Sequence, residues 1–350
     1  MDRALELIGE SLLALSEGRR LDENDAYALM DAIMQGQATA VQVSGILMAL
    51  AVRGESVDEL TGFARAMRRH AQSVPIAHRP LLDTCGTGGD RSFSFNVSTV
   101  SALVAAGAGA HVAKHGNRSA TSKSGSADLL EALGVEISQA PSEVAALVDE
   151  VGFGFLFAQK VHLSMRYAAQ TRKELGVRTV FNLLGPLTNP AHPEYQLLGV
   201  FAGEWVRPIT EVLSRLGLKR AVVVHGAGGL DEVSLAGPTQ YGVADAESLR
   251  FGSWLPEDFG LPTYPKEAFR GGDPAANAVI CRQILAGEPS AYLDMVLANA
   301  GVALYASEMA GDPREGVEMA RRSVQDGRAA AVLEALIRRS PVAKEAGDVS

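Results

Sequence analysis

DTCGTGGDRSFSFNVST, residues 83–99, is the segment that decides the fold. It follows a short apolar run and precedes a predicted helix. Glycine lets the backbone approach an anion closely, and successive N–H groups can form a nest for phosphate oxygens. Asn96, Ser98 and Thr99 can cap the helix, whose N-terminus also favours anions. The segment therefore predicts a strand, a phosphate loop and a helix, with a simple tight turn as the alternative. It is neither a Walker lysine loop nor a dinucleotide fingerprint.

A second polar loop, KHGNRSATS, occupies residues 114–122 and is followed by GSAD at 125–128. It also lies between a predicted strand and a predicted helix. Two cations and several hydroxyls on one loop suit a group with several phosphates. A solvated basic loop is the alternative for one such segment. Two loops at successive strand ends favour a ligand, because open α/β sheets bind ligands beyond the carboxyl ends of their strands.

Two adjacent carboxylates follow the predicted strand Ala221–His225, in the segment GGLDE at residues 228–232. Mg²⁺ typically takes one or two carboxylates and fills its other positions with phosphate oxygens and water. An exposed acidic turn is the alternative when the segment is considered alone. Together with two phosphate loops, Asp231 and Glu232 indicate a magnesium site.

The fourth segment is RKELGVRTVFNLLGPLTNP, residues 172–190. Arg172 could bind a carboxylate through two parallel hydrogen bonds. Surface pairing with an acidic neighbour is the alternative for this arginine. The Gly-Pro and Asn-Pro dipeptides at residues 185–186 and 189–190 indicate a fixed turn between helices.

The chain outside these motifs changes character near Pro80. Before it, apolar residues recur at helical spacing over residues 22–35 and 40–53 and after a capping box at 56–59. After it, predicted strands and helices alternate, which predicts an α/β fold with a mostly parallel central sheet flanked by helices, plus a smaller all-helical domain. The predicted strands are His111–Lys114, Val135–Ile137, Phe153–Phe157, Leu197–Phe201 and Ala221–His225. Helices are predicted near 99–108, 126–133, 142–150, 205–216 and over much of 274–338.

Composition limits the functional class of this 350-residue chain. Its 47% hydrophobic content allows a large core in one large domain or two unequal ones. No apolar run reaches the roughly 18 residues of a membrane span, and the N-terminal helix lacks signal-peptide features, so we expect a cytoplasmic protein with no membrane partner. Cys85 and Cys281 form neither a disulfide framework nor a zinc motif. A net charge of −9 argues against nucleic-acid binding and requires local groups to bind any anionic substrate.

At these segments the chain resembles the anthranilate phosphoribosyltransferases of tryptophan biosynthesis. Their signatures stand here in order and at similar spacing: GTGGD (86–90), N-x-S-T (96–99), KHGNR with a Ser/Thr-rich loop and GSAD (114–128), R-x-x-LG-x-RT-x-FN-x-LGPL-x-NP (172–190) and G-L-DE (229–232). The N-terminal helices and Asn299-Ala300 also fit, so the resemblance covers nearly the whole chain.

The resemblance implies two domains and a dimer. A small helical domain would comprise residues 1–75, joined by about 163–190. A large α/β domain of residues 76–162 and 191–345 would bind phosphoribosyl pyrophosphate (PRPP) and Mg²⁺. The family usually forms homodimers through the helical part. The substrates would be PRPP and anthranilate.

The resemblance also implies site residues. Positions that match PRPP contacts are Gly86, Gly89, Asp90, Ser94, Asn96, Val97, Ser98, Thr99, Lys114, His115, Gly116, Asn117, Arg118, Ser119, Ala120, Thr121, Ser122 and Ser126. Ser98, Asp231 and Glu232 match Mg²⁺ ligands, and Gly86, Asn117 and Arg172 match anthranilate contacts. Lys114, His115 and Arg172 are the candidate catalytic residues.

Some residues depart from the family pattern. Arg91 stands where glycine is usual, and Ser94 replaces a threonine but keeps the hydroxyl. From Ala158 to Thr171, the residues Ala158-Gln159, Leu163-Ser164 and Ala169-Gln170-Thr171 stand where the family usually has other residues. These changes flank the expected acceptor site, whereas the donor motifs are intact.

The expected chemistry follows from the substrates. Cleavage of the C1–pyrophosphate bond leaves positive charge on the ribose, while Lys114 and Mg²⁺ would neutralise the leaving group. The aniline nitrogen is neutral at pH 7 and needs no strong base, so positioning suits His115 better than proton transfer. Cys85 fits a small buried hydrophobe better than a nucleophile. Two alternatives are a pyrimidine nucleoside phosphorylase, which carries a different phosphate signature, and a non-catalytic nucleic-acid-binding relative.

Overall fold

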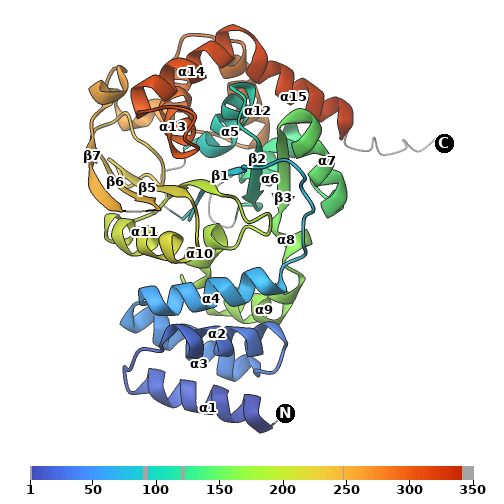
Figure 1. Cartoon of the computed structure of the whole chain (residues 1–350), viewed down its shortest axis with the longest axis vertical. Helices are drawn as coiled ribbons and strands as arrows, with labels where there is room; N and C mark the ends of the chain where they lie inside the picture. Colours follow the sequence, from blue (N-terminus) through green and yellow to red (C-terminus); the bar gives the residue numbers. More distant parts are fainter. Residues whose placement is uncertain (1, 90–93, 120–122, 247, 341–350) are drawn as a thin grey trace, which may run out of the picture.

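The N-terminal helices form a bundle at one end of the molecule (Figure 1). The computed structural model describes residues 2–89, 94–119, 123–246 and 248–340. The bundle contains α1 (Asp2–Ser16), α2 (Glu23–Met34), α3 (Ala40–Arg53) and α4 (Val57–His70). The capping box predicted before α4 is present, because Ser56 Oγ accepts the N–H of Glu59 and the Glu59 carboxylate accepts the N–H of Ser56. Local sequence signals therefore place the start of this helix correctly.

A seven-stranded sheet occupies the centre of the larger part, in the order β3-β2-β1-β4-β5-β6-β7. The strands are β1 (Leu82–Gly86), β2 (Val112–Gly116), β3 (Phe153–Phe157), β4 (Tyr195–Gly199), β5 (Arg220–Gly226), β6 (Thr239–Asp245) and β7 (Leu249–Trp254). The strands β3, β2, β1, β4 and β5 pair in parallel, while β6 and β7 add an antiparallel edge. The prediction of a mostly parallel sheet is confirmed.

The strand predicted at Val135–Ile137 was wrong. These residues are absent from the ladders of the sheet, although Val135 and Ile137 are 2% and 1% exposed. The N–H of Glu136 donates to the carbonyl of Ser340, 2.7 Å away, so this segment packs against the end of the C-terminal helix. Val135 and Ile137 alternate with the polar Glu136, but an alternation over only three residues is too short to separate a strand from a buried connecting segment.

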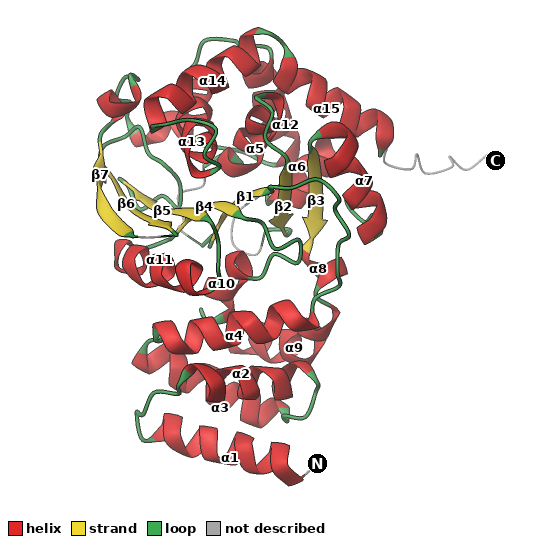
Figure 2. Cartoon of the chain, in the orientation of Figure 1, coloured by secondary structure: helices red, strands yellow, loops and turns green. Residues whose placement is uncertain are grey.

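Helices cover both faces of the sheet (Figure 2). One face carries most of a core that includes α5 (Val97–Gly107) and α13 (Ala291–Ala306). The remaining longer helices are α6 (Ser126–Leu133), α7 (Pro141–Val151), α9 (Arg166–Leu175), α11 (Val206–Arg215), α12 (Pro274–Leu285), α14 (Pro313–Gln325) and α15 (Arg328–Arg339), and the short ones are α8 (Ala158–Val161) and α10 (Phe181–Leu184). The helices predicted from the alternating pattern are therefore present, each within a few residues of its expected bounds.

The bundle and the opposite face of the sheet share one hydrophobic cluster. Phe63 of α4, Leu198 of β4 and Val223 of β5 belong to it, and α4 contacts α11 directly. α9 lies far along the chain but packs on α2 and α3, so the segment after β3 returns to the bundle. The fold thereby brings residues 166–190 to the junction between bundle and sheet. In the part of the chain that the structure describes, no helix has both the length and the apolarity to cross a membrane.

Candidate functional site

The glycine loop after β1 lies directly against the acidic loop after β5. The N–H of Gly88 donates to Asp231 Oδ2, 2.7 Å away. A Cβ at Gly86 would stand 2.4 Å from the same oxygen, and a Cβ at Gly199 would stand 1.6 Å from the Asp231 carbonyl oxygen. Because real Cβ contacts do not occur at such distances, glycine is required at both strand ends for the acidic loop to fit. The glycine loop and the acidic loop, which are about 140 residues apart in sequence, are therefore in direct contact.

Glu232 reaches the first turn of α5. Its Oε1 accepts the N–H of Ser98 at 3.2 Å, and Lys114 Nζ lies 3.3 Å from Ser98 Oγ. Lys114 is 1% exposed and also donates to the carbonyl of Thr84. Burial lowers the pKa of Lys114, and the nearby carboxylates of Asp83, Glu232 and Asp231 partly oppose this. The three predicted metal ligands and the predicted pyrophosphate lysine therefore converge.

The oxygens at this place fit magnesium. Two carboxylates and one hydroxyl are hard oxygen donors, and Mg²⁺ needs only one or two protein carboxylates when a phosphate supplies further oxygens. Among the residues that the structure describes, no three or more His, Cys, Asp or Glu side chains gather into a fuller metal cluster. The site is thus suited to a metal that arrives with a phosphate ligand.

The N-terminus of α5 connects the two phosphate loops. Asn96 occupies the N-cap position, but its side chain does not cap the helix as predicted. Its Nδ2 donates to the carbonyl of Ser124 at 3.0 Å, and its Oδ1 accepts from Asn277 at 2.9 Å. Thr99 Oγ1 donates to Ser126 Oγ at 3.0 Å. The first turn of α5 is thereby fixed to the second loop, with Val97 buried beneath it.

The KHGNR loop is held to α6 by Arg118. This guanidinium pairs with Asp128 at 3.0 Å and with Glu131, and Asp128 also accepts the N–H of Ser119 at 3.1 Å. The charge of Arg118 is therefore largely matched within the protein. Asn117, also in this loop, accepts a hydrogen bond from Gln159 at 3.3 Å. Gly116 ends β2 at the same edge.

His115 faces a second buried histidine, His162, which the sequence analysis did not include. Their ring centroids are 5.0 Å apart, with an interplanar angle of 62°. Neither Nε2 atom has a hydrogen-bond partner among the described residues. Burial lowers the pKa of His115 well below its usual value and lowers the pKa of His162 to about 4. Both imidazoles are therefore neutral at pH 7.

This burial predicts acid sensitivity through His162. The unfolded chain binds a proton near pH 6.5, whereas the folded chain does so only near pH 4, so stability is lost as the pH falls through this window. We expect the burial of His162 to lower the free energy of unfolding by about 2 kcal/mol when the pH falls from 7 to 5. Urea unfolding of the unaltered protein and of His162→Gln at both pH values measures the difference. An equal pH dependence in the two proteins would contradict this expectation.

Arg172 lies on α9 at the junction with the bundle. It is half-buried, its guanidinium is 4.9 Å from the centroid of the Phe181 ring, and burial lowers its pKa. Among the residues described, it has no ion pair, so the alternative of surface pairing with an acidic neighbour is not realised. From the same segment, Arg178 donates to the carbonyl of Gly89 and packs on Phe201. The segment thus reaches the glycine loop.

The remaining predicted residues divide into two groups. Ser94 pairs in an antiparallel bridge with Arg270. Asp90, Ala120, Thr121 and Ser122 lie outside the described residues.

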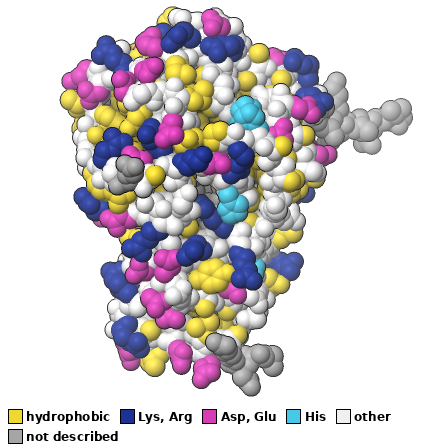
Figure 3. Space-filling model, viewed as in Figure 1, with side chains coloured by type: hydrophobic (Ala, Val, Ile, Leu, Met, Phe, Trp, Pro, Cys, Tyr) yellow, Lys and Arg dark blue, Asp and Glu magenta, His cyan; other side chains and the backbone are white. Residues whose placement is uncertain are grey.

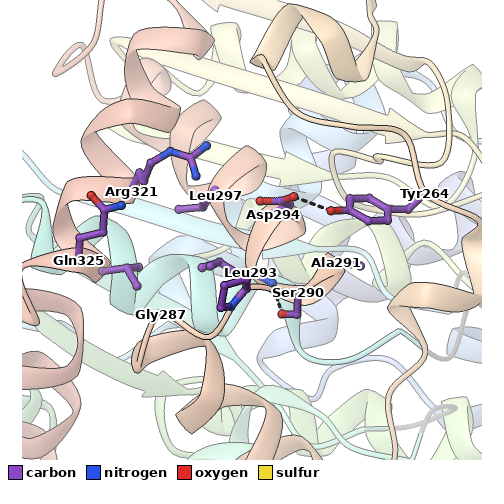
Figure 4. Close-up of a pocket in the computed structure, with 11 residues that line it drawn as sticks. Tyr264, Gly287, Ser290, Ala291, Leu293, Asp294, Leu297, Arg321 and Gln325 are labelled. Atoms are coloured by element: carbon purple, nitrogen blue, oxygen red, sulfur yellow. Dashed lines mark hydrogen bonds between the residues drawn. The ribbon is translucent and has the colours of Figure 1, made fainter.

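A cavity of about 490 Å³ lies at the N-terminus of α13, lined by residues such as Leu293, Asp294 and Arg321 (Figure 4). No predicted site residue lines this cavity, and its Asp294 already accepts a hydrogen bond from Tyr264 at 2.6 Å.

Comparison with known proteins places the chain in a family. Residues 78–330 match the glycosyl transferase family, a/b domain, and residues 10–71 match the helical bundle domain of that family. An anthranilate phosphoribosyltransferase from Thioalkalivibrio sulfidiphilus is 47% identical, over 94% of this chain and 97% of the relative. One from Symbiobacterium thermophilum is 48% identical, over 92% and 95%.

Solved structures agree with this similarity. The crystal structure of anthranilate phosphoribosyltransferase from Thermus thermophilus is 45% identical and superposes with a TM-score of 0.88, covering 94% of this chain and 98% of that one. The enzyme from Saccharomyces cerevisiae in complex with PRPP and Mg is 30% identical with a TM-score of 0.86, covering 97% and 98%. With both domains matched and similarity along nearly its full length, the chain belongs to the anthranilate phosphoribosyltransferase family.

Proposed function

We propose that the protein transfers the 5-phosphoribosyl group of PRPP to the amine of anthranilate and releases pyrophosphate, with Mg²⁺ as cofactor. The observation that carries this proposal is the convergence of both phosphate loops, Lys114 and the Asp231-Glu232 pair at one edge of the sheet. The yeast relative in complex with PRPP and Mg, and the same relative in complex with 4-fluoroanthranilate, support both substrates and the metal.

The donor half is the set of residues around the first turn of α5. We assign PRPP to the glycine loop, the turn at residues 96–99 and the KHGNR loop. Ser98, Asp231 and Glu232 would hold Mg²⁺, which when bound neutralises charge on the phosphate oxygens. The ammonium of Lys114 is desolvated beside Ser98, so its interaction with a phosphate would be stronger than at an exposed position.

The reaction exchanges one bond at C1 of the ribose. The C1–oxygen bond breaks, pyrophosphate leaves with the electron pair, and the lone pair of the aniline nitrogen forms the C1–nitrogen bond. The nitrogen then releases a proton. The positive charge of Lys114 favours the departing anion. His115 is neutral and buried, which suits it to hold the acceptor in place rather than to act as a cation.

The acceptor half lies between the KHGNR loop and α9. We assign the anthranilate carboxylate to Arg172, with Gly86 and Asn117 as further contacts. An arginine that is half-buried and has no acidic partner among the described residues is suited to an anionic ligand. We add His162 to this half, because its Nε2 is buried beside His115 and has no hydrogen-bond partner among the residues that the structure describes.

We also propose the domain division and the dimer. The small domain would comprise residues 1–75 joined by about 163–190, as the packing of α9 on α2 and α3 supports. The remainder to residue 345 would form the large domain.

The dimer surface would lie on the helical bundle. Four large hydrophobic side chains of α1 and α3 are exposed: Leu5 (47%), Leu13 (57%), Val41 (82%) and Val52 (82%). Such a surface suits a second copy of the chain. A cytoplasmic location is supported by two free, buried cysteines.

Val41→Asp combined with Val52→Asp is expected to separate the dimer. Two charges on this face would have to be buried without partners in an interface. Light scattering should give 36.8 kDa for the variant and twice this value for the unaltered chain. Val279→Asp, on α12 at the other end of the molecule and 57% exposed, is the control that should remain dimeric. A variant mass equal to that of the unaltered chain would exclude this face as the interface.

The proposed function is tested against the phosphorylase alternative by supplying both sets of substrates. PRPP, Mg²⁺ and anthranilate should release pyrophosphate and give a product with the mass of N-(5-phosphoribosyl)anthranilate. Thymidine with inorganic phosphate should release no thymine. The opposite pattern would replace phosphoribosyl transfer with nucleoside phosphorolysis.

Titration with single-stranded DNA at low and moderate salt tests the nucleic-acid alternative. On the face shown in Figure 3, acidic and basic side chains are interspersed, which gives no support to a polyanion surface.

A further inference from the structure

The ladder between β1 and β2 opens at the site. Only Leu82 and Val112 are in register between these strands, whereas β1 with β4 and β2 with β3 each keep five residue pairs. Both phosphate loops begin where β1 and β2 end, at Gly86 and Gly116. Backbone groups that face the gap need other partners, because an unpaired buried N–H or C=O is costly.

Side chains fill this gap. Asp83 Oδ1 accepts the N–H of His115 at 3.2 Å, and Lys114 Nζ donates to the carbonyl of Thr84. In the same gap, Asn189 Nδ2 donates to the carbonyl of Ala113 at 2.8 Å. The separation of the two strands is therefore set by side-chain hydrogen bonds.

Asp83 is joined to the acceptor segment through one buried amide. Gln196 of β4 lies opposite Asp83 in the register, and its Nε2 donates to Asp83 Oδ2 at 3.1 Å and to the carbonyl of Pro186 at 2.7 Å. Asp83 and Gln196 are 0% and 1% exposed. Pro186 belongs to the segment that begins at Arg172, so this chain of hydrogen bonds runs from the KHGNR loop to the acceptor half.

We infer that Asp83 and Gln196 are positioning residues, which hold the loop that follows Lys114 and the segment that carries Arg172 at a fixed separation. The inference rests on the proposed function, since it concerns alignment of the two substrates. Neither side chain is exposed to the site. Gln196 acts through the carbonyl of Pro186, whereas Asp83 acts through the N–H of His115 and also lies near the charge of Lys114. Loss of this bridge would allow the loop that follows Lys114 and the segment that carries Arg172 to shift relative to each other. A shift of about 1 Å can cost roughly 100-fold in rate without abolishing binding.

The chemistry of the bridge makes isosteric variants informative. In Asp83→Asn, the Oδ1 atom can still accept from His115, but the new amide would meet the Nε2 donor of Gln196. If Gln196 turns its amide to relieve this conflict, its oxygen would face the carbonyl of Pro186. Gln196→Met keeps the length of the side chain and removes the hydrogen bonds that Nε2 donates to Asp83 and Pro186, together with the one to Cys85 Sγ at 3.2 Å. Both variants therefore break the bridge while nearly preserving its volume.

The test compares three variants of the full-length protein with the unaltered chain. Asp83→Asn and Gln196→Met should lower kcat by about 10- to 100-fold while the KM values of PRPP and anthranilate change less than about threefold. Ser323→Ala is the control: its buried hydroxyl donates to Val104 at 2.9 Å, at the far end of α5. Its Tm should fall without a change in kcat. A fall in Tm with unchanged kcat in the bridge variants would reduce the bridge to a structural role and overturn the inference.

Hydrogen exchange provides a readout that needs no turnover. Amide exchange in a peptide covering residues 112–118 should be faster in both bridge variants than in the unaltered chain, and unchanged in Ser323→Ala. Unchanged exchange in the bridge variants would also overturn the inference. If the unaltered chain leaves anthranilate unreacted, the proposed function fails, while the exchange comparison still decides whether the bridge holds the loop.

Discussion

Asp231→Asn combined with Glu232→Gln is expected to lower kcat by at least about 1,000-fold at saturating Mg²⁺ while the fold is retained. The variants keep the shape and the acceptor oxygens that bind the N–H groups of Gly88 and Ser98. What they remove is negative charge, on which a divalent cation at this place depends. The measurement is kcat over a range of Mg²⁺ concentrations, together with Tm.

The matched control is Asp245→Asn, a carboxylate at the end of β6 that pairs with Arg220 at the start of β5, whereas the acidic loop follows the other end of β5. It should leave the Mg²⁺ dependence unchanged. Activity of the double variant equal to that of the unaltered protein at saturating Mg²⁺ would remove the metal assignment from these two carboxylates.

Arg172→Ala is expected to weaken anthranilate binding far more than PRPP binding. Truncating one partner of a desolvated charge pair costs about 2–4 kcal/mol, which corresponds to roughly 30- to 1,000-fold in affinity. The half-buried position of Arg172 over the Phe181 ring supports such a cost. The KM of anthranilate should therefore rise by this factor, whereas the Kd of PRPP should be nearly unchanged.

Lys173→Ala is the control for charge alone, since Lys173 is the exposed neighbour of Arg172 on α9. It should change neither constant appreciably, because exposed charges contribute little. Equal losses for both substrates in Arg172→Ala would show that this arginine supports the structure of the junction rather than the acceptor.

Local sequence signals predicted the fold wherever they were strong. The capping box before α4 and the alternation of apolar runs with helical spacing located most elements. The edge strands β6 and β7 were missed because each carries an internal glycine, Gly242 and Gly252, and because Leu249–Trp254 buries no residue, so it shows no alternation of buried and exposed positions. Val135–Ile137 was predicted as a strand, because an alternation over only three residues is too short to separate a strand from a buried connecting segment.

The candidate site was predicted as separate motifs, and the fold brings them together. The contact of Gly88 with Asp231 depends on chain topology, which local patterns suggest only through the carboxyl-end rule. His162 lies in the segment expected to flank the acceptor site, but no motif singles it out, and Gln196 is a single polar residue inside a buried strand. They matter only through neighbours that are 47 and 113 residues away, His115 and Asp83. Asn96 was expected to cap α5, but Ser124 competes for its side chain.

The most direct test is the fluorescence of anthranilate in the presence of purified protein, PRPP and Mg²⁺. Transfer of the phosphoribosyl group should make this fluorescence decline, and the decline should require both PRPP and Mg²⁺. A constant signal from protein that still binds PRPP would contradict anthranilate as the acceptor. The departures between Gln159 and Thr171 would then be the place to seek the determinants of a different amine.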